Sequence, residues 1–314
     1  MYKSKKIAVV VPAYNEEKLI GRVIETTPKF VDSIYIIDDA SKDNTSSVVA
    51  AYQGKSHIPI KLIKHEKNKG VGGAIISGHS AALIDQMDIM VVMAGDAQMD
   101  PSDLPTLLDP IVNGEADYAK GNRFISGEAW RKMPKTRFFA NTGLSFLNKF
   151  ASGYWNVSDP QCGYTAISRE ILQKLDLKKL SNGYHFENSI LIELNMVNAR
   201  VIDVPIKAVY GIGEKSGINH FVALFSFSIF LLKSFWLRLI HKYVLRDFHP
   251  LFFFYLFGLI FFLLGLLAGL YFIIARVSGE IIANTSALFA VVLFTTGLQM
   301  LLFAMWFDRD YLRR

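Results

Sequence analysis

The sequence predicts an α/β protein with a doubly wound sheet in its N-terminal part, then interfacial helices, and finally a hairpin of two membrane-spanning helices. Three observations predict this organisation. Short apolar runs alternate with helical patterns in the first part of the chain, polar clusters follow those runs, and two long uncharged segments lie near the end. Apolar residues also make up 51% of the 314 positions, which is high for a wholly soluble protein.

Four short apolar runs, each bounded by charged or turn-forming residues, are typical of strands that are buried on both faces of a parallel sheet. These runs are Ile7–Val11, Ser33–Ile37, Ile60–Lys64 and Ile89–Ala94. Helices are predicted between them at Glu16–Thr27, Thr45–Gln53 and Gly73–Ile84. The alternation of strand and helix predicts the doubly wound sheet. The first run stops at Pro12 without a small-residue cleavage site, so we interpret it as a strand and not as a signal peptide.

The distribution of charge favours a membrane over a nucleic acid as the partner. The net charge is +6, and residues 221–314 hold eight Lys/Arg against four Asp/Glu, which leaves 26 against 24 for the first 220 residues. A nucleic-acid-binding domain would itself be basic, whereas here the basic excess lies beside the apolar segments, where anionic lipid headgroups would meet it. The one cysteine, Cys162, excludes an internal disulfide and leaves no zinc cluster.

The last third of the chain is expected to lie on and then cross a membrane. Residues 221–246 alternate apolar blocks with basic residues, as expected of interfacial helices. Leu251–Ile274 and Ala283–Phe307 contain no charged residue, and each exceeds the roughly 20 apolar residues that a bilayer requires. Two buried core helices are the alternative interpretation.

The basic residues that flank these two segments predict their orientation. The loop between the segments holds only Arg276 and Glu280 as charged residues. Three basic residues precede the first segment and three follow the second, namely Arg238, Lys242 and Arg246, and Arg309, Arg313 and Arg314. By the positive-inside rule, the folded domain and both termini face the cytoplasm. The predicted domains are a folded domain at 1–220, interfacial helices at 221–248 and two spans at 249–314.

Polar clusters follow three of the predicted strands, at the positions where doubly wound sheets bind their ligands. Tyr14–Glu17 follows the first strand, Asp38-Asp39 follows the second and Gly95–Gln98 follows the fourth. The first cluster opens a helix whose free amides could bind a diphosphate, and the second could accept hydrogen bonds from a ribose or a base. Either cluster could instead simply cap a helix.

The glycine-rich segment Asn68–Ala74 raises the possibility of a dinucleotide-binding fold. In that fold the glycine fingerprint directly follows the first strand, and here no glycine follows the first strand before Gly21. The sequence therefore argues against an NAD-dependent enzyme, and the turn is expected to let the backbone approach a ligand or a neighbouring strand.

Asp96 and Gln98 are the candidate metal ligands. Alternate residues of an extended segment point the same way, so the two side chains could hold one hard cation. Mg²⁺ or Mn²⁺ prefers such oxygen ligands and could neutralise charge on a departing nucleoside diphosphate. A surface turn before Pro101 is the alternative.

Taken in order, these clusters resemble glycosyltransferase family 2, and the two terminal spans narrow the resemblance to its dolichol-phosphate mannosyltransferase and polyprenyl-phosphate glycosyltransferase branch. The resemblance covers nearly the whole chain. It implies a GT-A fold, a nucleotide-sugar donor, Mg²⁺ or Mn²⁺ as cofactor, and inversion at the sugar carbon. Many relatives have Asp-x-Asp where this sequence has Ala94-Gly95-Asp96, so the first carboxylate is absent and the number of protein ligands to the metal is in question.

The resemblance also implies roles for individual residues. The implied donor-binding residues are Pro12, Tyr14, Glu16, Asp39, Gly95, Asp96 and Arg123. The implied metal ligands are Asp96 and Gln98, the implied acceptor-phosphate ligands are Arg137 and Asn141, and the implied catalytic residues are Asp96, Asp159 and Arg137. Asp159 is expected to be a base or an orienting acid. Surface ion pairs are the alternative for Arg123, Arg137 and Asp159.

The expected function is transfer of a sugar from a UDP- or GDP-linked donor to polyprenyl or dolichyl phosphate, for cell-envelope or protein glycosylation. The acceptor oxygen would displace the nucleoside diphosphate directly, and a phosphate monoester that is mostly dianionic at neutral pH needs no strong base. One alternative is transfer to another membrane glycolipid. Another is a non-catalytic membrane scaffold, favoured by Ala94 and by the lack of an arginine before Ser216. A homo-oligomer is compatible with each of these three functions.

Overall fold

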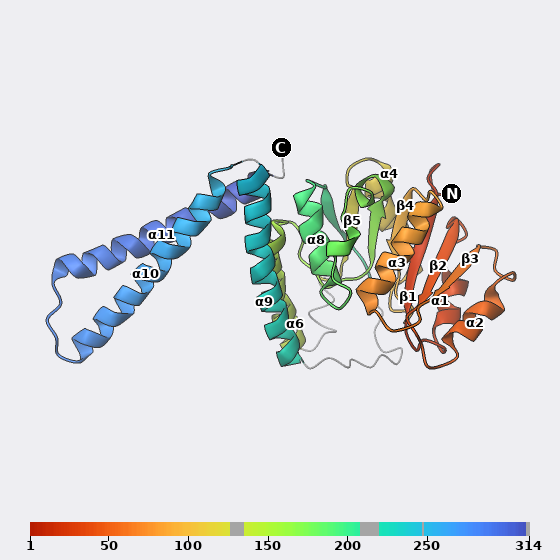
Figure 1. The fold of residues 1–314 in the computed structure, drawn as a ribbon, viewed down its shortest axis with the longest axis horizontal. Coiled ribbons are helices and arrows are strands. Elements are labelled where there is room, and N and C mark those ends of the chain that lie inside the picture. The colour runs from red at the N-terminus through yellow and green to blue at the C-terminus, as the bar shows by residue number, and fades with distance from the viewer. Residues whose placement is uncertain (126–134, 208–219, 247, 312–314) are drawn as a thin grey trace. The chain divides into compact units, whose positions relative to one another are not determined.

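The computed structural model describes residues 1–125, 135–207, 220–246 and 248–311, which form two compact units, Met1–Ser234 and Phe235–Arg314. The first unit holds all the named strands and most of the helices, and the second holds the two longest helices (Figure 1). The polar clusters therefore fall in the first unit and the long apolar segments in the second.

A seven-stranded sheet forms the centre of the first unit, in the order β3-β2-β1-β4-β6-β5-β7. Its strands are β1 (Ile7–Ala13), β2 (Ser33–Asp38), β3 (Ile60–Lys64), β4 (Ile89–Val92), β5 (Tyr118–Asn122), β6 (Thr165–Ser168) and β7 (Val201–Pro205). Every strand is parallel to the others except β6, which is antiparallel to β4 and β5. The predicted α/β architecture is confirmed, but the sheet is mixed where only parallel strands were predicted.

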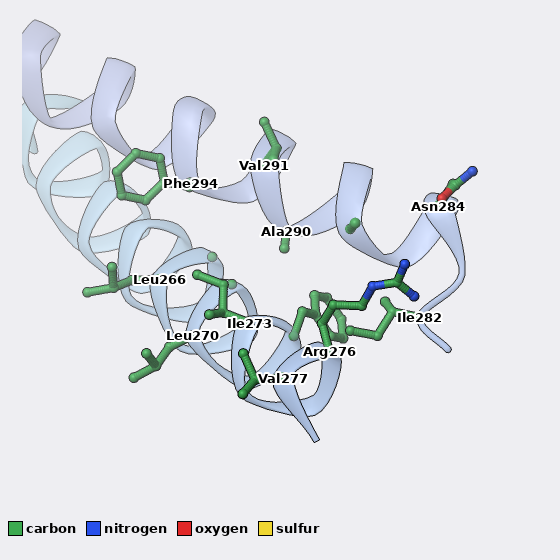
Figure 2. Close-up of a pocket in the computed structure, with 14 residues that line it drawn as sticks. Leu266, Leu270, Ile273, Arg276, Val277, Ile282, Asn284, Ala290, Val291 and Phe294 are labelled. Atoms are coloured by element: carbon green, nitrogen blue, oxygen red, sulfur yellow. The ribbon is translucent and has the colours of Figure 1, made fainter. Parts of the chain in front are cut away.

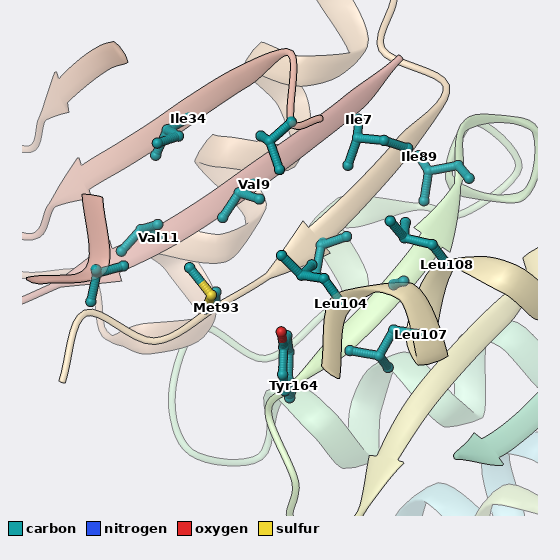
Figure 3. Close-up of a cluster of buried hydrophobic side chains, with 14 of the residues drawn as sticks. Ile7, Val9, Val11, Ile34, Ile89, Met93, Leu104, Leu107, Leu108 and Tyr164 are labelled. Carbon is teal, nitrogen blue, oxygen red and sulfur yellow. The ribbon is translucent and has the colours of Figure 1, made fainter. Parts of the chain in front are cut away.

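Helices cover both faces of this sheet. They are α1 (Ile20–Thr26), α2 (Thr45–Tyr52), α3 (Val71–Ile84), α4 (Leu104–Val112), α6 (Lys135–Ser152), α7 (Arg169–Leu172) and α8 (Phe186–Met196), with 3-10 turns η1 (Pro101–Asp103) and η2 (Leu177–Lys179). Alternate residues of β1 point to opposite faces. Val9 and Val11 are fully buried in the core cluster, to which α4 contributes Leu104 and Leu107 (Figure 3).

The opposite face of β1 packs against α3 at a glycine. A Cβ added to Gly78 would lie 2.3 Å from Val10 Cγ1 and 2.7 Å from Ile37 Cδ1, so the helix contacts the strands directly. Because helices cover both faces, β1 and β2 are buried at nearly every position and do not alternate between buried and exposed side chains. This explains the continuous apolar runs in the sequence.

The second unit contains α10 (Leu251–Val277) and α11 (Asn284–Tyr311), which are long and apolar enough to cross a membrane. Their most apolar windows have mean hydropathies of 2.6 and 2.1, yet only 22% and 17% of these windows is buried. Core helices would be buried, so the structure does not support that alternative. The chain enters α10 through α9 (His220–Leu239) and a π-helical segment, η3 (Ile240–Arg246).

Candidate active site

The loops at the carboxyl ends of β1, β2 and β4 each contain a non-glycine residue in the left-handed region. Asn15, Ala40 and Ala97 have φ angles of 58°, 61° and 57°. Such residues cost roughly 1–2 kcal/mol each and tend to cluster at functional sites. All three loops lie at the edge of the sheet where the sequence predicted the site.

The loop after β1 is held in place by the loop after β2. The amides of Asn15–Glu17 donate to the side chains of Ser41, Thr45 and Asp43, at 2.9, 2.8 and 3.1 Å. Helix α1 consequently begins at Ile20 and not at Glu16. The expectation that free helix amides bind a diphosphate here is therefore wrong, because side chains of the neighbouring loop occupy those amides.

Asp39 is buried, with 3% of its surface exposed, and holds the turn that leads into α3. Its two carboxylate oxygens accept hydrogen bonds from the amides of Lys69 and Gly70, both at 2.8 Å, and Oδ1 lies 2.6 Å from His65 Nδ1. Its predicted contact with the donor remains a prediction, and the structure shows a second role in shaping the loop.

The glycine-rich turn lets another loop approach closely. A Cβ on Gly72 would lie 2.1 Å from the carbonyl oxygen of Ser181, and one on Gly70 would lie 2.6 Å from that of Asn182. The amide of Gly73 donates to the Asn182 carbonyl at 3.0 Å. The close approach is therefore to the loop at Ser181 and Asn182 and not to a neighbouring strand, and approach to a ligand stays a prediction.

This packing predicts that Gly72→Ala destabilises the protein by about 1–3 kcal/mol, because the added methyl group meets backbone that cannot move aside. Gly143→Ala is the control: a Cβ there meets nothing within 4 Å, and alanine in a helix is worth roughly 0.5–1 kcal/mol over glycine. Thermal unfolding of both variants checks the prediction, which fails if the two midpoints shift in the same direction.

The candidate metal ligands lie in a turn and not in an extended segment. Asp96 Oδ1 accepts a hydrogen bond from the Gln98 amide at 3.0 Å, and Ala97 between them is left-handed. The predicted alternation of side chains along a strand is therefore wrong at this point. A short turn closed by the aspartate fixes the two side chains relative to each other instead.

This turn lies directly against the loop after β1. A Cβ on Gly95 would lie 3.1 Å from the Pro12 carbonyl oxygen and 3.4 Å from Glu16 Cγ. Predicted donor residues from two strand ends thus meet at one place, and Tyr14 beside them is 43% exposed.

The electrostatics of this meeting point suit a cation. The pKa of Glu16 is raised from its ordinary 4.5 to about 7, first by burial and then by the negative charges of Asp96 and Asp43. A divalent cation would relieve this repulsion, and oxygen ligands are the kind that Mg²⁺ and Mn²⁺ prefer. The residues present therefore fit such an ion, although the residues that the structure describes contain no cluster of three or more His, Cys, Asp or Glu side chains that could hold a metal.

Arg123 and Asp159 form a bidentate pair beyond the end of β5. Arg123 Nε donates to Asp159 Oδ2 at 2.7 Å, and Nη2 donates to Oδ1 at 2.8 Å. The aspartate is 1% exposed, whereas 17% of the arginine side chain is exposed. Both carboxylate oxygens face the guanidinium, so Asp159 orients Arg123, which matches the orienting role expected for it better than the role of a base.

The loop that carries Asp159 reaches the segment just after the Asp96–Gln98 turn. A Cβ on Gly163 would lie 3.5 Å from Met99 Cε and 3.4 Å from Glu187 Oε1, and Tyr164 donates to the Asp100 carbonyl at 3.1 Å. The structure thus places the chain that follows Asp159 against the residues that follow the Asp96 turn.

Behind this site lie buried charged residues that the sequence reasoning missed. Lys120 of β5 is fully buried and donates to the Cys162 carbonyl. Asp203 of β7 accepts from Asn122 Nδ2 at 2.6 Å and from the Ser158 amide at 2.7 Å. Lys120 is the one charged residue of β5, Tyr118–Asn122, and a lysine within a strand was the signal that could have revealed this network.

A family model now decides what kind of protein this is. The model described as glycosyl transferase family 2 matches residues 8–176, which is more than half of the chain. The chain belongs to glycosyl transferase family 2. The match runs from the second residue of β1 to the residues just after α7, and among the site residues discussed so far only Ser181, Asn182, Glu187 and Asp203 lie outside it.

Curated members of the family are similar over most of their length. A UDP-N-acetylglucosamine–dolichyl-phosphate N-acetylglucosaminyltransferase from Methanococcus voltae is 34% identical over 218 residues, covering 66% of this chain and 86% of that protein. A polyprenol monophosphomannose synthase from Mycolicibacterium smegmatis is 28% identical over 230 residues, covering 71% and 85%. These relatives do not support the scaffold alternative.

A solved family 2-like fold confirms the predicted GT-A type of sheet. Glucosyl-3-phosphoglycerate synthase from Mycobacterium tuberculosis, crystallised with Mn²⁺, UDP and glucosyl-3-phosphoglycerate, superimposes with a TM-score of 0.55 at 22% identity. The superposition covers 75% of this family 2 chain and 80% of that one. At this identity the likeness shows the fold alone.

The two residues predicted to bind the acceptor phosphate lie on α6. The side chains of Arg137 and Asn141 lie outside the described residues of this family 2 protein, so their role stays a prediction.

The raised pKa of Glu16 predicts that divalent cations bind this family 2 site more tightly at high pH. The folded-state pKa of about 7 lies above the ordinary 4.5, so the folded protein binds this proton more tightly than the unfolded chain does. The protonated acid therefore contributes to the stability of the fold at low pH, and this contribution is lost as the pH rises through about 7. A cation needs the carboxylate, so we expect Mn²⁺ affinity to be about tenfold lower at pH 6 than at pH 8. Calorimetric titration with Mn²⁺ and a nucleoside diphosphate measures this, and Glu16→Gln should flatten the dependence while Glu17→Gln preserves it. An unchanged slope in Glu16→Gln would contradict the assignment.

The Arg123 pair predicts how Asp159→Asn will behave. The amide can accept only one of the two guanidinium hydrogen bonds, so we expect turnover to fall by about 10- to 100-fold at every pH, with the pH–rate profile unchanged in shape. Loss of a base would instead remove one limb of that profile. Asp117→Asn is the control. Asp117 forms a similar pair with the exposed Arg200, just before β7, and this substitution should leave turnover unchanged.

Proposed function

We propose that this family 2 chain transfers a sugar from a UDP- or GDP-linked donor to the phosphate of polyprenyl or dolichyl phosphate, with inversion at the sugar carbon. The product is a lipid-phosphate-linked monosaccharide for cell-envelope or protein glycosylation. The observation that carries the lipid acceptor is the pair of exposed apolar helices, α10 and α11, in a chain whose relatives are named for dolichyl and polyprenyl acceptors.

The donor side of the proposal rests on the site between the loops after β1 and β4. Asp96, with Gln98 and Glu16, would hold Mg²⁺ or Mn²⁺, which when bound would neutralise charge on the nucleoside diphosphate. Pro12, Tyr14 and Gly95 shape the neighbouring surface. Arg123, fixed by Asp159, supplies a guanidinium fork that suits a diphosphate or phosphate oxygen.

The acceptor side requires positioning more than proton transfer. A phosphate monoester with a second pKa of about 6 is mostly dianionic at neutral pH, so its oxygen can attack the sugar carbon without a strong base. This agrees with the engagement of both Asp159 oxygens by Arg123. Arg137 and Asn141 are proposed to hold the acceptor phosphate.

The membrane part of the proposal is that residues 221–248 lie on the bilayer and that residues 249–314 cross it twice, with the transferase domain at 1–220 and both termini in the cytoplasm. Ile229 and Leu232 of α9, at helical spacing, are 53% and 63% exposed, which suits a helix that rests on lipid. A polyprenyl chain cannot leave the bilayer cheaply, because each buried CH₂ is worth roughly 0.8 kcal/mol. The active site must therefore work at the membrane surface.

The test is to incubate the purified, membrane-reconstituted chain with labelled UDP- and GDP-sugars and polyprenyl phosphate in the presence and absence of Mn²⁺. The expected result is a labelled lipid that forms only with polyprenyl phosphate, from one class of donor, and only with a divalent cation. If the label enters a glycolipid and not polyprenyl phosphate, the acceptor is that glycolipid and the proposed acceptor is wrong. Donor that is never consumed would overturn the proposed enzyme activity.

A further inference from the structure

Helices α10 and α11 pack tightly along one part of their length and separate along the other. A Cβ on Gly265 would lie 2.4 Å from the amide nitrogen of Phe294, and one on Gly297 would lie 2.2 Å from that of Phe262, so the backbones touch there. A Cβ on Gly269, one turn further along α10, meets nothing within 4 Å. The helices thus open into a cleft toward the loop that joins them.

This cleft has a volume of about 810 Å³, within the range of about 300–1,000 Å³ typical of small-ligand sites. Its walls are mostly aliphatic and aromatic side chains from both helices, such as Leu266, Ile273 and Phe294 (Figure 2). Arg276 is its only charged lining residue, and Asn284 lies opposite at the start of α11. Figure 2 shows the Arg276 side chain extending from α10 toward the start of α11.

Arg276 has no acidic partner in the part of the chain that the structure describes. Among the ion pairs formed by residues 1–125, 135–207, 220–246 and 248–311, none includes Arg276. Glu280, in the loop between α10 and α11, is likewise in none of these pairs. A cation at the mouth of an apolar cleft is complementary to a molecule with an anionic head and an apolar body.

The dimensions of the cleft suit acyl chains. Its lining extends from Gly265 to Val277, which is about 18 Å of helix rise and matches the depth of one bilayer leaflet, about half of the roughly 30 Å hydrocarbon core. A hydrocarbon chain, with carbon contacts at about 4 Å, needs about 15–20 Å² of cross-section, so the cleft has room for two chains.

We propose that this cleft binds one anionic phospholipid, whose two acyl chains lie between α10 and α11 and whose phosphate is held by Arg276 and Asn284. The inference rests on the membrane hairpin of the proposed function. The rise from Leu251 to Arg276 is about 38 Å, which exceeds the roughly 30 Å hydrocarbon core of a bilayer. Arg276 therefore lies at headgroup level in the leaflet on the loop side of the membrane.

The same distance excludes the sugar acceptor as the occupant. The acceptor phosphate must reach the transferase domain, which joins the hairpin at the Leu251 end of α10. Arg276 lies at the other end of that helix. The phosphate that Arg276 binds therefore belongs to a lipid of the opposite leaflet.

The test measures lipid binding to the purified full-length chain by native mass spectrometry and by thermal stabilisation in detergent. The probes are phosphatidylglycerol and phosphatidylcholine with identical acyl chains. We expect one phosphatidylglycerol to bind at least about tenfold more tightly than phosphatidylcholine. Arg276→Gln should reduce this preference to within about twofold, and Gly269→Leu, which fills the cleft, should release both lipids.

Arg309→Gln is the matched control, since it removes an exposed arginine from the opposite end of the hairpin and should preserve the preference. Equal binding of the two lipids, or a preference that survives Arg276→Gln, would overturn the proposal. Displacement of phosphatidylglycerol by stoichiometric polyprenyl phosphate would also overturn the proposal, because the occupant would then be the acceptor lipid. If Gly269→Leu changes the oligomeric mass without changing the bound lipid, the cleft is a contact between copies of the chain and the proposal is wrong.

Failure of this inference is distinguishable from failure of the proposed function. None of the lipid readouts uses sugar transfer, and extraction of cell membranes with alkaline carbonate reports independently whether the hairpin is inserted. An inserted, active transferase without lipid preference overturns the cleft alone. A chain that alkaline carbonate releases from the membrane overturns the hairpin on which both depend.

Discussion

Replacing Asp96 with alanine is expected to lower turnover by about 1,000-fold, the largest effect of any single substitution in the site. Asp96 is the one carboxylate of the turn after β4, because Ala94 stands where many relatives carry a second, and its charge is among those that raise the pKa of Glu16. Its loss leaves Gln98 as the other predicted ligand. A factor of 1,000 corresponds to about 4 kcal/mol, which is the scale of charge stabilisation that a bound divalent ion supplies.

The measurement is initial-rate transfer to polyprenyl phosphate at saturating donor, repeated over a series of Mn²⁺ concentrations. Asp100→Asn is the matched control: Asp100 is a nearby acid whose side chain caps η1 through the Ser102 amide, and asparagine can keep that cap. We expect the control to lose less than about threefold. Asp96→Ala should also lose more activity than Asp159→Asn, and the reverse order would show that an acid at position 159 matters more than the metal site.

The N-terminal half of the sheet could be predicted from the sequence because its strands are buried on both faces. The strand Ile60–Lys64 was predicted with the observed bounds, and β1, β2 and β4 were found within two residues at each end. Continuous apolar runs of this kind follow directly from helices on both faces of the sheet.

The C-terminal half of the sheet could not be predicted in the same way. β5 contains Lys120 and β7 contains Asp203, and each forms a hydrogen bond with a partner far away in the sequence, Cys162 and Asn122 respectively. Buried polar residues paired over such distances leave no local apolar pattern. The reversal of β6 likewise depends on contacts between segments that no short window contains.

The candidate site also has features that the local sequence predicts and features that depend on contacts between distant segments. The sequence placed Glu16 and Asp96 at neighbouring strand ends, and the structure brings them together. It could not show that side chains of the loop after β2 occupy the amides of Asn15–Glu17, or that Asp159 is bonded to Arg123. These hydrogen bonds join loops that are 26 or more residues apart.

A second large effect is expected in the other unit, where Arg238 and Asp308 form a fully buried ion pair. Arg238 Nη1 and Nη2 donate to the two oxygens of Asp308 at 2.8 and 2.7 Å, and the Tyr243 hydroxyl donates to Asp308 Oδ1 at 2.7 Å. Both charged side chains are 0% exposed. This pair joins the end of α9 to the last turn of α11 and so closes the base of the hairpin.

Asp308→Ala is expected to destabilise the protein by about 3–5 kcal/mol, because it removes the carboxylate to which both terminal nitrogens of the fully buried Arg238 donate. The apparent unfolding midpoint in detergent should fall by roughly 10 °C. Arg309→Gln, which changes an exposed neighbour, is the control and should shift the midpoint by no more than about 2 °C.

The double variant Arg238→Met/Asp308→Leu distinguishes two contributions to the free energy of unfolding: the destabilisation caused by removing one charge of the pair, and the net stabilisation by the pair itself. Two apolar side chains of similar volume leave no charge to solvate, so most of the lost stability should return. If the double variant is as unstable as Asp308→Ala, the pair is needed for the geometry of the hairpin base itself. In that case the hydrogen bond from Tyr243 to Asp308 is the next contact to remove, by Tyr243→Phe, since it would then carry part of the same constraint.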